Sequence, residues 1–220
     1  MISCNPSAWF LSTIFVWFSL FAIATLCKGN LDPTDGFSPV PLKEGNFKLQ
    51  KPYNVDPNKR YSFKNGVRRL WVFSDDKPLN RKSHTKPRTE IRITGYNYSE
   101  GIWQFEGFGY IPNGTTGVSI MQIFGATSHA TSFMLHVYDG QLKYYDENVI
   151  KDDIYDRWFR VNVIHSVGEN IKVFINGIKK YVANDRGGKD HYFKFGVYTQ
   201  KESSHYMESR WKNVQIYKKL

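Results

Sequence analysis

The chain has 220 residues, and its 30 Lys and Arg outnumber its 20 Asp and Glu, for a formal net charge of +10. This length suits one large all-β domain with its own core, and the basic balance favours anionic ligands. Nucleic acid is not the expected anion, because the sequence has no zinc-finger or helix-turn-helix pattern.

The N-terminus reads as a secretory signal. Residues 8–26 are uncharged and largely apolar, and Cys27-Lys28-Gly29 follows. We therefore expect a signal peptide at 1–27, cleaved near 27–29, and a single domain at 30–220. A retained signal anchor is the alternative, because the apolar run approaches the ~20 residues that span a bilayer. The expected product is a monomer in the vacuole or outside the cell (cell wall), with no stable membrane insertion after cleavage. Both cysteines, Cys4 and Cys27, lie in or beside the signal, so the mature domain has no internal disulfide.

The rest of the chain alternates with a period near two, broken by short turns. Asn65-Gly66, Asp139-Gly140 and Asn176-Gly177 are hairpin turns by composition. An extended, proline-rich segment at 32–57 precedes the first hairpin. Strands are expected within 60–64, 67–73, 88–94, 101–111, 117–124, 132–138, 141–145, 158–164, 172–175, 178–182, 192–200 and 209–217. Many short strands without βαβ alternation predict an all-β fold, an antiparallel two-sheet β-sandwich of the jelly-roll type.

Three strands carry polar faces that suit a carboxylate ligand. In Arg88-Thr89-Glu90-Ile91-Arg92, alternation places Arg88, Glu90 and Arg92 on one face. Glu90 can then hold the guanidinium groups, whose free donors bind a ligand carboxylate. A surface ion-pair ladder of little energetic value is the plainer interpretation.

The second strand groups Ile120, Gln122 and Phe124 on one face, with Met121 and Ile123 on the other. Gln122 can donate to a carboxylate without adding charge. A solvated glutamine is the alternative.

The third strand, at 192–200, sends its aromatic and aliphatic side chains toward a core, and four polar residues to the other face. These four are Tyr192, Lys194, Tyr198 and Gln200. A phenol, an ammonium and an amide on one face indicate an anion site, although a solvated strand face has the same pattern.

These three stretches resemble the motifs of the alginate-lyase family of polysaccharide lyases, namely Arg-Thr/Ser-Glu-Leu-Arg, Gln-Ile/Val-His and Tyr-Phe-Lys-Ala-Gly-x-Tyr-x-Gln. The resemblance implies a jelly roll with a concave groove that carries all three. It also implies that arginine and glutamine neutralise a uronate carboxylate, while a histidine or tyrosine removes the C5 proton. Arg88, Gln122 and Tyr198 match these roles, with Lys194 and Arg92 beside them, but Phe124 stands where the histidine is expected.

A second resemblance, to plant citrate-binding proteins, extends over almost all of the expected mature chain. Asp32-Pro33-Thr34-Asp35-Gly36-Phe37 and Met207-Glu208-Ser209-Arg210-Trp211-Lys212 are among the matching stretches. The group implies a citrate ligand and a vacuolar or secretory location.

Two functions remain open. Binding of a small polycarboxylate such as citrate, without turnover, is preferred, because a positioned base contributes typically about 10²–10⁴-fold to a rate and Phe124 cannot serve as one. The alternative is a lyase that cleaves uronic-acid polymers by β-elimination, with Tyr198 as acid and base and an acidic oligosaccharide as ligand. A structural cell-wall lectin has no specific support in the sequence.

Other sites are expected only at the surface. Asn97-Tyr98-Ser99 and Asn113-Gly114-Thr115 are glycosylation sequons, at Asn97 and Asn113. The histidines show no two-histidine metal spacing, so neither a metal nor a cofactor is predicted.

Overall fold

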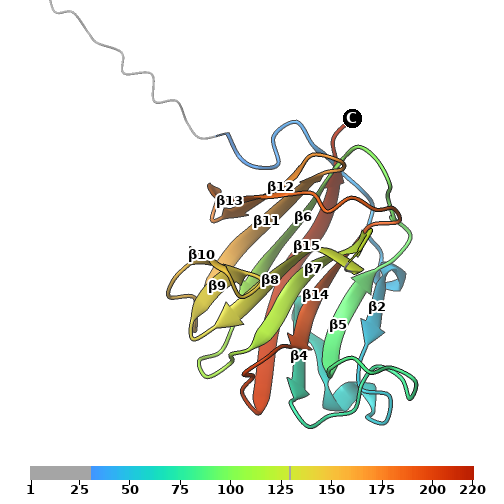
Figure 1. The fold of residues 1–220 in the computed structure, drawn as a ribbon, viewed down its shortest axis with the longest axis vertical. Coiled ribbons are helices and arrows are strands. Elements are labelled where there is room, and N and C mark those ends of the chain that lie inside the picture. Colours follow the sequence, from blue (N-terminus) through green and yellow to red (C-terminus); the bar gives the residue numbers. More distant parts are fainter. Residues whose placement is uncertain (1–30, 129) are drawn as a thin grey trace, which may run out of the picture.

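The computed structural model describes residues 31–128 and 130–220, so the expected signal peptide lies outside the described residues. These residues form two packed antiparallel sheets (Figure 1). The first sheet has eight strands. Its order is β13 (Ile178–Asn184), β12 (Asn170–Ile175), β11 (Trp158–Ser166), β6 (Ile102–Tyr110), β15 (Tyr206–Lys218), β4 (Val67–Phe73) and β3 (Tyr61–Lys64), and β1 (Ser38–Pro39) pairs with β15.

The second sheet has seven strands and carries all three polar motifs. Its order is β10 (Asn148–Lys151), β9 (Gln141–Tyr144), β8 (Ala130–Tyr138), β7 (Val118–Ala126), β14 (Tyr192–Thr199), β5 (Arg88–Ile93) and β2 (Phe47–Gln50). The described helices are two single 3₁₀ turns, η1 (Glu44–Asn46) and η2 (Pro57–Lys59). The predicted all-β, two-sheet jelly roll is therefore confirmed.

The predicted hairpin turns are also confirmed. Asn65-Gly66 joins β3 to β4, Asp139-Gly140 joins β8 to β9, and Asn176-Gly177 joins β12 to β13. In each turn both residues have positive φ, from 48° to 81°. Two consecutive positive φ values define the type I′ turn, whose twist matches that of the flanking strands.

Three strands and one strand face differ from the sequence prediction. β1, β2 and β10 lie in segments where no strand was expected. In β7 the pairing shifts between Ser119 and Met121, so both Ile120 and Met121 enter the hydrophobic core. The expectation that Ile120 shares the face of Gln122 was therefore wrong, because a β-bulge interrupts the alternation.

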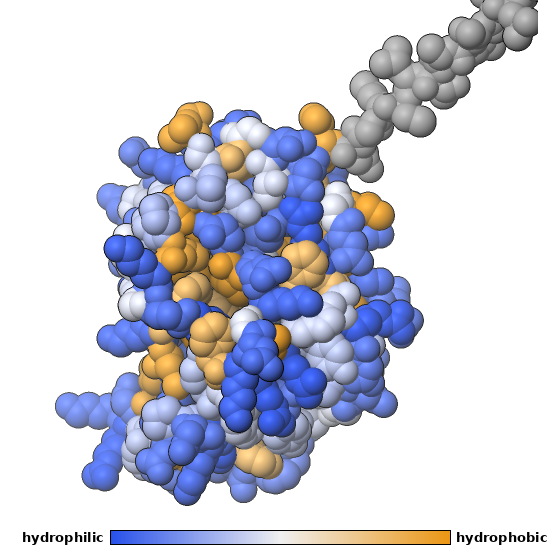
Figure 2. Space-filling view, turned by 180° about the vertical axis from the view of Figure 1, so that it is seen from behind, coloured by the Kyte–Doolittle hydropathy of each residue, from blue (hydrophilic) through white to orange (hydrophobic). Residues whose placement is uncertain are grey.

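A single hydrophobic cluster fills the space between the sheets. Its largest fully buried side chains include Trp211, Phe105, Phe133, Phe159 and Phe193. Such a core lets a domain of this size fold without disulfides. The face turned away in Figure 1 carries mainly hydrophilic side chains, with a group of hydrophobic ones near its centre (Figure 2). Within the described part of the chain, no helix has the length and apolar character needed to cross a membrane.

Candidate functional site

β5 contributes a charged triplet to the outer face of the seven-stranded sheet. Thr89 and Ile91 are buried in the sandwich, with exposures of 0% and 1%. Strand alternation therefore turns Arg88, Glu90 and Arg92 to the opposite side, as predicted.

β14 lies between β5 and β7 and supplies the centre of this face. Phe193, Phe195 and Val197 are at most 1% exposed in the core, so the residues between them face outward. Gly196 has φ of +139°, and a Cβ there would lie 2.4 Å from the Thr89 carbonyl oxygen. Only glycine permits this close approach of β5 to β14.

Glu90 is the hub of the charged cluster. Its Oε2 atom lies 2.6 Å from Lys194 Nζ and 3.2 Å from Arg88 Nη1, and Gln122 Nε2 donates to its Oε1. Glu90 is 1% exposed, and a carboxylate so buried is costly unless it has hydrogen-bonding and charged partners such as these. The predicted pairing of Glu90 with both arginines is thus half right: Arg88 binds it, but Lys194 takes the place of Arg92.

The register aligns cations from three neighbouring strands. Lys48 on β2 pairs with Arg92, and Arg92 pairs with Lys194, which in turn pairs with Gln122. Directly paired residues share a face, and neighbouring strands lie about 4.8 Å apart. Lys48, Arg92 and Lys194 therefore form one row of cations across the sheet, here called the cation row.

Arg92 is the member of the cation row whose side chain stacks on an aromatic ring but forms no ion pair with a described residue. Its guanidinium lies 3.8 Å from the centroid of the Tyr192 ring, and Phe124 stacks on Tyr192 at 4.9 Å. Among residues 31–128 and 130–220, no hydrogen bond or ion pair engages the Arg92 side chain, and its Nε is buried without a partner. Arg92 therefore keeps its donors for a ligand.

Arg88, four residues before Arg92 on β5, has a similar arrangement. Its guanidinium lies 3.7 Å from the Tyr198 ring centroid, and its Nε is also buried without a hydrogen-bond partner. The Tyr198 side chain is half-buried. Stacking on aromatic faces fixes both arginines with little loss of donor capacity.

Positive charge dominates the face. Lys48, Arg88, Arg92 and Lys194 lie around the Glu90 carboxylate, and these five side chains together carry a formal charge of +3. Burial lowers the pKa of Lys194, and the Glu90 carboxylate, which raises it, does not fully compensate. An anionic ligand would relieve the repulsion among these cations.

A second cross-sheet row contains the residues relevant to proton transfer. Arg88 pairs with Tyr198, Tyr198 with Ser119, Ser119 with His136, and His136 with Lys143. His136 thus lies two strands from Tyr198. It is 4% exposed, neither ring nitrogen has a hydrogen-bond partner in the part of the chain that the structure describes, and burial lowers its pKa to about 4. Such an imidazole is a weak base near neutral pH.

Three predicted residues lie outside the cluster. The Gln200 side chain donates to the backbone oxygen of Tyr198 at 3.1 Å, beyond the end of β14. Asn97 and Asn113 are exposed, and Asn97 Nδ2 donates to Asp190 at 2.7 Å.

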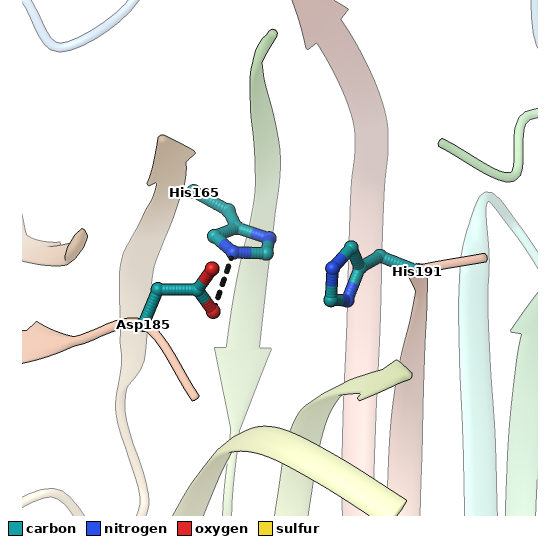
Figure 3. A group of neighbouring side chains, drawn as sticks. All are labelled: His165, Asp185 and His191. Carbon is teal, nitrogen blue, oxygen red and sulfur yellow. Dashed lines mark ion pairs between the residues drawn. The ribbon is translucent and has the colours of Figure 1, made fainter. Parts of the chain in front are cut away.

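Sequence reasoning missed other members of the site. Lys48 and Gln50 lie on β2, in a segment interpreted as irregular, and Gln50 pairs with Glu90 in register. The alternation in Phe47-Lys48-Leu49-Gln50 was the available signal. The interior cluster of His165, Asp185 and His191 (Figure 3) had no such signal, because its members come from separate strands and loops.

Comparison with known proteins agrees with this architecture. The alginate lyase family model matches residues 40–218. The citrate-binding protein of Hevea brasiliensis is 55% identical over 207 residues, covering 91% of this chain and 87% of that protein.

Solved structures show the same fold at low identity. The alginate lyase of a Corynebacterium species superposes with a TM-score of 0.64 at 14% identity, covering 78% of this chain and 93% of that one. The marine alginate lyase of Zobellia galactanivorans has a TM-score of 0.61 at 14% identity, with coverages of 84% and 98%.

Proposed function

Because the chain belongs to the alginate lyase family, we propose that it uses the outer face of the seven-stranded sheet to bind citrate without cleaving a polysaccharide. The observation that carries this proposal is the cation row of Lys48, Arg92 and Lys194, with Arg92 free of any intramolecular ion pair in the described residues. The 55% identical relative named as a citrate-binding protein supports the choice of ligand.

The geometry suits a compact polycarboxylate. The neighbouring strands that carry the three cations lie about 4.8 Å apart, so one ligand with several carboxylates can meet more than one of them. Each charge-assisted hydrogen bond contributes about 1.5–3 kcal/mol. The aromatic rings of Tyr192 and Tyr198 hold the arginines in place before the ligand arrives, which lowers the entropic cost of binding.

Binding without turnover rests on the lack of a competent base beside Tyr198 among residues 31–128 and 130–220. Phe124 offers only a hydrocarbon ring, already stacked on Tyr192. His136, in the same row as Tyr198, is neutral but weakly basic. Gln122, which would neutralise a uronate carboxylate, instead donates to Glu90.

A uronate lyase is the second candidate, favoured by one observation. The Tyr198 hydroxyl makes no hydrogen bond within the described ranges, and the Arg88 guanidinium stacks on its ring. A free tyrosine hydroxyl next to an arginine can serve as both acid and base in β-elimination.

One pair of measurements separates the two candidates. Isothermal titration with citrate and with oligouronates measures binding, and absorbance near 235 nm detects unsaturated elimination products. We expect saturable citrate binding and no absorbance change. If the wild-type protein releases unsaturated product and Tyr198→Phe abolishes this release, the protein is a lyase and the proposal of binding without turnover is wrong.

We extend the proposal to the cellular setting. Cleavage of the signal at 27–29, a vacuolar or extracellular location, glycosylation of Asn97 and Asn113, and a monomeric state are all proposed from the sequence. The exposure of both asparagines supports glycosylation. N-terminal sequencing and mass spectrometry of protein from its native source test these points.

A further inference from the structure

A buried cluster outside the anion-binding face contains three side chains that are typical metal ligands. His165 lies on β11 of the eight-stranded sheet, Asp185 directly follows β13 of that sheet, and His191 directly precedes β14 of the other. One ligand atom from each lies within 4.8 Å of the other two. Figure 3 shows the His165 ring between the Asp185 carboxylate and the His191 ring.

One polar atom on each of these side chains lacks a hydrogen-bond partner among the described residues, although Asp185 Oδ2 accepts from the Gly168 N–H at 2.8 Å. His165 Nε2 and Asp185 Oδ1 are 3.1 Å apart, on side chains 0% and 2% exposed, yet they are not aligned as a hydrogen bond. His191 is 0% exposed, and its Nε2 has no hydrogen-bond partner within residues 31–128 and 130–220. Leaving several such groups unsatisfied is costly, and buried groups of this kind are typically paired or bound to a metal.

The outer nitrogens of both rings are held as in many metal-bound histidines. His191 Nδ1 lies 3.2 Å from the backbone oxygen of Phe124, and His165 Nδ1 lies 3.0 Å from the Tyr98 hydroxyl. A carbonyl only accepts, so this contact requires a proton on His191 Nδ1 and leaves Nε2 free as a ligand. For His165, the tautomer in which Nδ1–H donates to Tyr98 leaves Nε2 free in the same way.

We propose that His165, Asp185 and His191 form a binding site for a divalent transition metal of the zinc type. Two imidazoles and one carboxylate are a common ligand set for zinc. The ligand atoms of a tetrahedral zinc are about 3.3 Å apart, given zinc bonds of about 2.0–2.1 Å. The His165–Asp185 contact of 3.1 Å is already near this spacing, and the third ligand needs to move by at most about 1.5 Å.

Burial and position indicate a structural role for the metal. The three side chains are enclosed and have no room for a substrate, whereas catalytic zinc sites keep an open position. The chain supplies three ligands, so a water would take the fourth position, as in catalytic sites; here that position is enclosed by protein and closed to a substrate. A metal here would join the two sheets at the start of β14. The first residue of β14, Tyr192, follows His191 directly and stacks on Arg92 of the anion-binding face.

Untagged protein stripped with EDTA tests the site with zinc alone. After equilibrium dialysis, we expect one zinc per chain by elemental analysis and a higher melting temperature. With Co²⁺ in place of zinc, we expect the intense visible absorption of a four-coordinate site.

Asp185→Asn and His191→Gln should weaken zinc binding by more than about 100-fold, because even a lost outer-sphere partner typically costs about 10–100-fold. Asp190→Asn and His205→Gln are matched controls at exposed positions and should bind zinc as the wild type does. Equal zinc affinity in both cluster variants would overturn the proposal. If those variants do not fold, the wild type decides: failure to retain zinc and to give the Co²⁺ spectrum would equally overturn it.

Discussion

Replacing Arg92 and Lys194 in turn by Met should distinguish a side chain that contributes to ligand affinity alone from one that also contributes to folding stability. Both side chains belong to the cation row, but Lys194 is 2% exposed and lies 2.6 Å from Glu90, whereas Arg92 has no ion-pair partner in the described residues. Met is close in length to both and removes only the charge and the donors. Lys194→Met therefore removes an ion-pair partner from the buried Glu90 carboxylate, whereas Arg92→Met does not.

Arg92→Met should cost binding and little else. The loss of one charge-assisted contact of about 1.5–3 kcal/mol corresponds to a citrate Kd about 10- to 150-fold weaker. Stability should change by no more than about 1 kcal/mol, the value of a partly exposed cation–π contact with Tyr192.

Lys194→Met should lower stability as well as binding. It leaves Glu90, at 1% exposure, with Arg88 and Gln122 as its remaining partners. Breaking a buried ion pair costs about 3–5 kcal/mol, and the two partners that stay favour the lower end of that range. Urea unfolding measures this difference between the variants.

Calorimetric titration with citrate and urea unfolding should be run on both variants beside Arg157→Met. Arg157 forms an exposed ion pair with Asp153, so this control lowers the net charge equally without touching the face. A folded Arg92→Met protein whose citrate Kd stays within about threefold of the wild type would refute the role given to Arg92.

Three further predictions follow from individual side chains. Phe124→His should leave citrate affinity nearly unchanged, and a large loss of citrate binding would mean that Phe124 contacts the ligand. Absorbance of this variant with oligouronates near 235 nm shows whether one added base restores turnover. His136 has its pKa lowered to about 4 by burial, so the unfolded chain binds its proton more readily, and stability should fall as pH drops from about 6.5 to 4. The His136 share of that fall is at most about 3 kcal/mol, and His136→Phe should remove it in urea unfolding followed against pH; an unchanged pH profile contradicts the assignment. Gly196→Ala should lower stability by about 3 kcal/mol or more, since its Cβ would meet the β5 backbone. Gly177→Ala, with open space around it, should cost about 1 kcal/mol. Equal losses of stability in thermal unfolding would argue against close approach at Gly196.

The sequence by itself determined most of the strands and most of their faces. Hairpin turns depend on local φ preferences of Asn, Asp and Gly, and the alternation of side chains along a strand is fixed by the backbone. For this reason the outward faces of β5 and β14 were correct residue by residue, with Arg88, Glu90 and Arg92 on one and Lys194 and Tyr198 on the other.

Only the tertiary structure decided which of these residues remain available to a ligand. The bulge in β7 moved Ile120 into the core, and strand pairing placed Lys48 of β2 beside Arg92. Among the residues that the structure describes, ion pairs engage Lys194 and leave Arg92 free.

The approach of His165, Asp185 and His191 likewise has no counterpart in sequence spacing. Strand order, bulges and long-range contacts depend on how the whole core packs, whereas propensity and periodicity report only on neighbours along the chain.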